Sequence, residues 1–263
     1  MVLTPQQCTF FESFGYLMLP RLMTDDIDWI IEEHGKVFEQ QGVVHDGSKR
    51  SMIVPFSDQR ERLCTLLDHS KVLGVLKSLL GDDFNYVGGD GNYYSGDTNW
   101  HSDGGHQAGL FAKYHLYLDP LTRDTGCIRV IPGSHLIGPW REHLQQTRQP
   151  DELLGIPGRD VPCIAAETEP GDVVVFNHNI YHASFGGGPA RRHMCLNVTS
   201  RAKTEAEVSE LDRYLRPAGR PKHWPGKYAP GAQDIMRNTA SPDRYVHLEQ
   251  VIQREQYYLN TTQ

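Results

Sequence analysis

The stretch Pro170-Gly-Asp-Val-Val-Val-Phe-Asn-His-Asn-Ile-Tyr-His-Ala-Ser184 begins with a turn and continues as a short apolar run. Pro-Gly is a turn signal, and a few apolar residues bounded by turn residues are typical of a buried strand. A Gly-rich turn follows at residues 186–188, and Arg191 opens another β-like run. This part of the chain therefore predicts successive buried strands.

The same pattern of short β-like runs and turn residues extends through the middle of the chain. Residues 113–119 alternate between apolar and polar side chains, as a half-buried strand does. Short β-like runs separated by Gly, Asp and Asn are expected at 85–87, 114–118, 128–131, 172–176 and 194–199. Several short strands next to helices predict a mainly β domain, a barrel or sandwich with flanking α-helices.

The two ends of the chain are more helical. A capping threonine, Thr4, and a stop at Gly15 bound a first helix, and residues 16–19 predict a strand. Thr24 is expected to open a second helix that ends at Gly42. Further helices are expected at 68–80, 204–215 and 242–257, with a Pro/Gly-rich stretch at 217–231.

Composition excludes several classes of protein. The 263 residues carry 26 Lys and Arg against 33 Asp and Glu, a net charge of −7 that disfavours nucleic-acid binding. No apolar run approaches the ~18 residues of a membrane span, and the first residues do not predict a signal peptide. Five widely spread cysteines without a C-x-x-C pair predict reduced thiols in a cytoplasmic protein. Oligomeric state is left open.

The candidate chemistry begins at Asn99-Trp-His-Ser-Asp103. His101 and Asp103 are separated by one residue, so both side chains leave a strand on the same face. One imidazole and one carboxylate, completed by a histidine from a later strand, form the 2-His-1-carboxylate set that suits Fe(II). The motif alone is weak evidence, because 13 His and 33 acids make chance matches common. A later His followed by an Arg, as in 182–191, strengthens it.

Three ordered motifs resemble the phytanoyl-CoA dioxygenase family of Fe(II)/2-oxoglutarate-dependent oxygenases. They are Trp100–Asp103 (W-H-x-D), Gly126-Cys-Ile-Arg-Val-Ile-Pro-Gly-Ser-His135, and Gly171-Asp172 followed by Phe176, His182-Ala-Ser184 and Arg191. The resemblance implies a double-stranded β-helix, a cupin-like jelly-roll barrel. We expect a single domain over 1–263, with residues 1–84 as a helical buttress and lid, 85–201 as the barrel core, and 202–263 as peripheral helices and loops.

The resemblance also implies roles for individual residues. His101, Asp103 and His182 match the iron ligands of the family. Arg191 matches the arginine that pairs with the far carboxylate of 2-oxoglutarate, and Ser184 matches a residue that hydrogen-bonds it. A polar residue on the strand before the H-x-D motif should also touch 2-oxoglutarate, and Asn92 and Tyr94 are both candidates. Arg192 remains an alternative to Arg191, because a one-residue change of register exchanges the two faces.

Other residues carry competing interpretations. His178 is a weaker candidate for the distal ligand than His182, since the family places that ligand six residues after the phenylalanine. Lys113 and Arg50 are candidate substrate contacts, although a snorkelling lysine and a solvated loop charge are the simpler interpretations. Trp100 is a third candidate contact, with a core side chain as the alternative.

The resemblance implies oxidation, in the first place hydroxylation, of a C–H bond in a small-molecule metabolite, with Fe(II), 2-oxoglutarate and O2 as cofactor and cosubstrates and with release of succinate and CO2. Two alternatives remain. A cupin-type metal enzyme that does not use 2-oxoglutarate would have no need of Arg191. A non-catalytic metal-binding member of the family usually lacks a ligand, whereas all three are present here. The substrate itself is not predicted.

Overall fold

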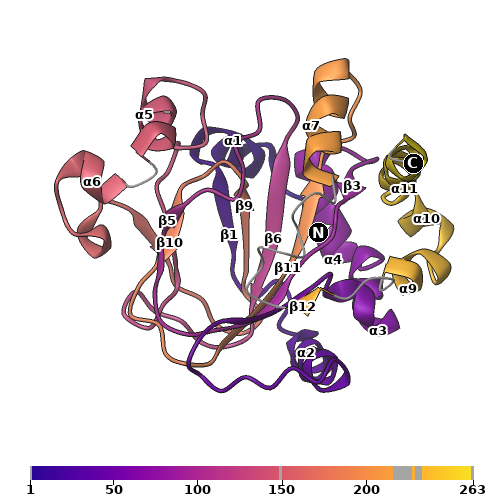
Figure 1. Cartoon of the computed structure of the whole chain (residues 1–263), viewed down its shortest axis with the longest axis horizontal. Helices are drawn as coiled ribbons and strands as arrows, with labels where there is room; N and C mark the ends of the chain where they lie inside the picture. Colours follow the sequence, from indigo (N-terminus) through magenta and orange to yellow (C-terminus); the bar gives the residue numbers. More distant parts are fainter. Residues whose placement is uncertain (1, 148–149, 216–226, 229–232, 262–263) are drawn as a thin grey trace.

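The computed structural model describes residues 2–147, 150–215, 227–228 and 233–261. Two β-sheets form its centre and helices surround them (Figure 1). The larger sheet has the strand order β1 (Tyr16–Leu19), β9 (Val173–Asn177), β6 (Phe111–Tyr117), β11 (Arg191–Thr199), β4 (Gly91–Tyr94), β2 (Ser51–Val54) and β12 (Lys227–Tyr228), and β3 (Asn85–Tyr86) also pairs with β11. The smaller sheet has the order β5 (Thr98–His101), β10 (His182–Ser184), β7 (Ile128–Val130) and β8 (Ile164–Ala166).

The strand pairings produce the jelly-roll arrangement. All of them are antiparallel except that of β12 with β2. Strands distant in sequence lie side by side, as when β9 pairs with both β1 and β6. The inner faces of the two sheets line one shared cavity. The fold is the expected mainly β double-stranded β-helix with flanking helices.

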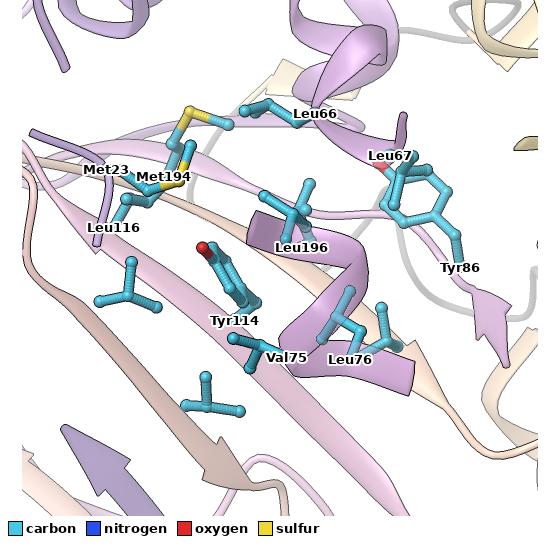
Figure 2. Close-up of a cluster of buried hydrophobic side chains, with 14 of the residues drawn as sticks. Met23, Leu66, Leu67, Val75, Leu76, Tyr86, Tyr114, Leu116, Met194 and Leu196 are labelled. Carbon is cyan, nitrogen blue, oxygen red and sulfur yellow. The ribbon is translucent and has the colours of Figure 1, made fainter. Parts of the chain in front are cut away.

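Helices cover the outer face of the larger sheet. The helices of the structure are α1 (Pro5–Phe14), α2 (Ile27–Gln40), α3 (Glu61–Cys64), α4 (Ser70–Leu80), α5 (Pro139–Thr147), α6 (Pro150–Leu154), α7 (Glu205–Leu215), α9 (Gln233–Asn238), α10 (Pro242–Tyr245) and α11 (Glu249–Thr261). Val75 and Leu76 of α4 belong to the same buried cluster as Tyr114, Met194 and Leu196 of the sheet (Figure 2). Burying each such aliphatic side chain contributes about 1.5–3 kcal/mol, so this layer fixes which face of β6 and β11 turns inward.

The smaller sheet packs against the segment that contains α5 and α6. The segment between β7 and β8, which contains α5 and α6, lies beside β5 and β10 in Figure 1. Its residues Leu144 and Val161 pack with Trp100, Tyr181 and other side chains in a separate buried cluster. Among the described residues, no helix is long and apolar enough to cross a membrane.

Several elements differ from their sequence-based expectations. The second helix begins at Ile27 rather than Thr24, with Asp26 as its N-cap residue. The helix expected at 242–257 is two helices, α10 and α11. Strands β2 and β8 and helices α5 and α6 were not expected, and the structure supplies the bounds of β4, β5 and β10, which the motifs only implied. Because β1 and β2 join the larger sheet, residues 1–84 also contribute to it. Most of the stretch 217–231 lies outside the described residues.

Candidate metal centre

Three side chains converge where β5 and β10 meet. His101 ends β5, His182 begins β10, and the two are direct partners in the antiparallel pairing. Asp103 follows His101 by two residues. One ligand atom from each of the three residues lies within 4.8 Å of the other two. Asp103 Oδ1 is 3.8 Å from Nε2 of both His101 and His182.

The backbone orients both imidazoles. Nδ1 of His101 lies 2.8 Å from the carbonyl oxygen of Asn99, and Nδ1 of His182 lies 3.0 Å from that of Ile180. A carbonyl oxygen only accepts, so each Nδ1 carries the proton and each Nε2 presents its lone pair toward Asp103. This is the tautomer that a metal-binding histidine needs. Two imidazole nitrogens and one carboxylate oxygen form a donor set that fits Fe(II).

The charges nearby keep the ligands ready to bind a cation. Burial by itself raises the pKa of Asp103, but the ammonium of Lys113 outweighs it and holds the pKa well below its usual range. Burial, with His101 adding to it, lowers the pKa of His182 to about 3. The carboxyl group is therefore ionised and His182 is neutral at pH 7, as metal ligation requires.

A cavity extends inward from these three residues. The empty space between its walls is about 550 Å³, a figure that includes the open mouth. Its walls combine both sheets: Thr98, His101, Ile128, His182, Ala183 and Ser184 come from the smaller sheet, and Tyr94, Lys113, His115, Tyr117, Phe176, Arg191 and His193 come from the larger one. Asp103 and Arg50 complete the lining.

Arg191 lies buried in this cavity with only 7% of its surface exposed. Its Nη1 donates to the carbonyl of Gly126 at 2.6 Å and to Ser184 Oγ at 3.2 Å, and its Nη2 donates to the carbonyl of Gly96. Nε has no partner. All three acceptors are neutral, and no described acid forms an ion pair with this guanidinium. A buried cation without an acidic partner is a preformed anion site.

Glycine at position 126 makes room for that guanidinium. Gly126 has φ +92°, and a Cβ there would lie 2.7 Å from Arg191 Nη1. Gly187 is similarly close, with a hypothetical Cβ 2.4 Å from Arg191 Cζ. Side chains at either position would push the arginine out of place.

Arg192 faces the opposite side of β11. Its guanidinium binds the carboxylate of Asp119, with Nη2–Oδ1 at 2.6 Å and Nε–Oδ1 at 3.1 Å. The side chain is 30% exposed. Arg192 does not line the cavity. The alternation along β11 therefore separates the two arginines completely.

The other candidate residues differ in whether their side chains reach the cavity. Tyr94 lines the cavity and stacks on His193, with ring centroids 4.8 Å apart. Arg50 lies over the Tyr94 ring at 4.2 Å and donates from Nε to Asn92 Oδ1 at 2.6 Å. Asn92 is fully buried and reaches the cavity only through Arg50.

Two residues turn away from the cavity. Trp100 is buried in the cluster under α5 and donates from Nε1 to the carbonyl of Gly158 at 2.8 Å, so it packs in the core instead of contacting a ligand. His178 is 1% exposed, and it is absent from both the cavity wall and the three-residue cluster. Its backbone carbonyl accepts from the amide of Gly104, close to Asp103.

Sequence reasoning missed part of the wall. His115, Tyr117 and His193 line the cavity, and His115 Nε2 lies 2.7 Å from His193 Nδ1. Their alternation with Lys113 and Arg191 along the strands was the available signal. Asp90 was also missed: its Oδ1 lies 3.9 Å from Lys113 Nζ, and its Oδ2 lies 3.6 Å from Arg50 Nη2. No pattern in the sequence points to Asp90.

Structural comparison finds the same fold in solved proteins, among them an alpha-ketoglutarate-dependent enzyme and a protein with 2-oxoglutarate bound. HygX from Streptomyces hygroscopicus, solved with nickel and 2-oxoglutarate bound, is 14% identical with a TM-score of 0.62, covering 78% of this chain and 90% of its own. The carbocyclase SnoK from nogalamycin biosynthesis is 17% identical with a TM-score of 0.60, covering 75% and 84%. EctD from S. alaskensis is 20% identical with a TM-score of 0.59, covering 79% and 78%.

Sequence comparison assigns the family. A search of curated proteins found no match. The profile of the phytanoyl-CoA dioxygenase (PhyH) family matches residues 11–194, which include the three-residue cluster and Arg191. The chain therefore belongs to the phytanoyl-CoA dioxygenase (PhyH) family of Fe(II)- and 2-oxoglutarate-dependent oxygenases.

Proposed function

We propose that this protein oxidises, by hydroxylation, a C–H bond of a small-molecule metabolite and releases succinate and CO2. In this proposal His101, Asp103 and His182 hold Fe(II). The observation that carries it is the convergence of their ligand atoms within 4.8 Å at the wall of a cavity that also contains the unpaired cation of Arg191. Bound Fe(II) would supply the O2 chemistry, in which one oxygen atom goes to 2-oxoglutarate and the other goes to the substrate C–H bond.

Arg191 and Ser184 are proposed to bind the far carboxylate of 2-oxoglutarate. Ser184 follows His182 by two residues on β10, which corresponds to about 6.6 Å along a strand. An extended five-carbon diacid spans a separation of this order. The planar guanidinium offers a fixed pair of donors to a carboxylate, and Tyr94 packs beside it with its ring centroid 5.5 Å from Arg191 Cζ.

The composition of the cavity supports a small polar substrate. Charged and hydrogen-bonding side chains dominate its walls, and Ile128, Phe176 and Ala183 are the apolar exceptions in the described lining. Arg50 is a candidate substrate contact because its guanidinium lies at the cavity wall with its side chain 28% exposed. All five cysteines are free, which supports a reducing compartment, and we place the enzyme in the cytoplasm.

Succinate release tests the proposal. The Fe(II)-loaded enzyme is incubated with 2-oxoglutarate and a panel of polar metabolites, and succinate is measured with and without each compound. We expect metabolite-dependent succinate, which His182→Ala abolishes and His178→Ala retains. Oxygen consumption without succinate would instead support a cupin-type enzyme independent of 2-oxoglutarate. Metal binding without any oxygen consumption would support a non-catalytic family member.

A further inference from the structure

The two oxygens of Asp103 have different surroundings. Oδ1 faces the histidines, at 3.8 Å from each Nε2, whereas Oδ2 lies 2.8 Å from Lys113 Nζ. We propose that Lys113 is a positioning residue that holds Oδ2 of Asp103, so that the carboxylate presents Oδ1 alone to the metal. This inference rests on the proposed function, because it takes His101, Asp103 and His182 as the metal ligands.

The fold directs Lys113 to this place. Lys113 lies on β6 opposite Phe176 of β9 and Asn197 of β11, near the middle of the larger sheet. Its neighbours Ala112 and Tyr114 face the outer hydrophobic core, so the alternation of the strand turns Lys113 inward. The side chain is only 13% exposed, which separates it from the snorkelling surface lysine that the sequence allowed.

A second carboxylate holds the ammonium from the other side. Asp90 Oδ1 lies 3.9 Å from Lys113 Nζ and 3.0 Å from the Sγ of Cys195, which donates to it. Asp90 Oδ2 faces Arg50 Nη2 at 3.6 Å. The ammonium is therefore fixed between two carboxylates, and this limits its freedom to swing toward a ligand in the cavity.

The consequence concerns how many positions the protein occupies on the metal. Two imidazole nitrogens and one carboxylate oxygen make three protein ligands, and 2-oxoglutarate and O2 need the remaining positions. A carboxylate whose second oxygen has no partner can turn, and Oδ1 then no longer keeps the position from which it faces both Nε2 atoms. Partners that orient metal-binding carboxylates typically change metal affinity by about 10–100-fold when they are removed.

Metal affinity without turnover tests the role. Mn²⁺ alone is titrated into the metal-free enzyme by calorimetry, for wild type, Lys113→Met, Lys113→Gln and Lys113→Arg. We expect Mn²⁺ to bind about 10-fold or more weakly to Lys113→Met, severalfold more weakly to Lys113→Gln, and with most of the affinity restored in Lys113→Arg. Lys113→Gln keeps a buried polar donor, so it gives the answer if Lys113→Met fails to fold.

The controls separate the possible failures. Lys36→Met removes an ion-paired but 39% exposed lysine and should leave Mn²⁺ affinity unchanged. Mn²⁺ affinity of Lys113→Met and Lys113→Gln within twofold of wild type would overturn the positioning role, and a raised substrate KM in those variants would assign Lys113 to substrate instead. If wild type and Asp103→Ala bind Mn²⁺ equally, the proposed metal set itself is wrong, whatever Lys113 does.

Discussion

Arg191→Ala should weaken the binding of 2-oxoglutarate strongly, and Arg192→Ala should not. Arg191 is 7% exposed and its guanidinium has no acidic partner among the described residues, whereas Arg192 already binds Asp119. Truncating one partner of a desolvated charged hydrogen bond costs about 2–5 kcal/mol, which corresponds to roughly 30- to 4,000-fold in affinity. A partly exposed ion pair such as that of Arg192 contributes about 0.2–1 kcal/mol, and to stability only.

Two measurements check this ranking. The KM for 2-oxoglutarate comes from succinate release, and the Kd comes from calorimetry on Mn²⁺-loaded enzyme without turnover. Arg191→Lys keeps the positive charge but loses the fixed pair of guanidinium donors, so its affinity for 2-oxoglutarate should be intermediate. Thermal unfolding shows whether each variant folds. A larger increase of KM and Kd in Arg192→Ala than in Arg191→Ala would refute the assignment of the inner face of β11 as the 2-oxoglutarate site.

Three further predictions concern other parts of the chain. Gly126→Ala should lower the free energy of unfolding by about 1–3 kcal/mol and raise the KM for 2-oxoglutarate. The reason is that the new Cβ would lie 2.7 Å from Arg191 Nη1, at a residue whose backbone φ is +92°. Unchanged thermal unfolding and an unchanged KM would contradict this prediction. Burial raises the pKa of Asp58 from 3.8 to about 6, so its contribution to stability is present below pH 4 and is lost as the pH rises through 6. Relative to Asp58→Asn, the wild type should therefore lose about 2 kcal/mol between pH 4 and pH 7 in urea unfolding, and a pH-independent difference would exclude this titration. In the proposed metal set the carboxylate of Asp103 takes a position on the metal that a halide would otherwise occupy. Products formed under ¹⁸O2 in chloride buffer should therefore carry oxygen-18 in mass spectra and no chlorine isotope pattern, and Asp103→Gly should lose activity without becoming a halogenase.

Local signals in the sequence were sufficient for much of the framework. Thr4 caps the first helix as expected, with Gln7 completing a capping box, and the strand at Tyr16–Leu19 has the expected bounds. The cap depends on contacts within a few residues, which a short window of sequence contains. The strand is marked by its own apolar run, although it pairs with the distant β9. Strands such as β5 and β10 are only four and three residues long. Such short strands do not show an alternating pattern of their own, so their bounds and their pairing come from the structure.

The sequence by itself determined the spacing of His101 and Asp103, the motif order that places His182 and Arg191 after them, and the alternation that puts Arg191 and Arg192 on opposite faces of a strand. Each of these follows from the period of two residues along a strand. Only the tertiary structure decided that β5 and β10 pair with His101 opposite His182 and that Arg191, not Arg192, lines the cavity without an acidic partner among the described residues. It also decided that Asp90 lies beside Lys113 of the cavity wall. Those relations join strands far apart in the chain, and they are set by the packing of two sheets whose outer faces are fixed by the surrounding hydrophobic layers.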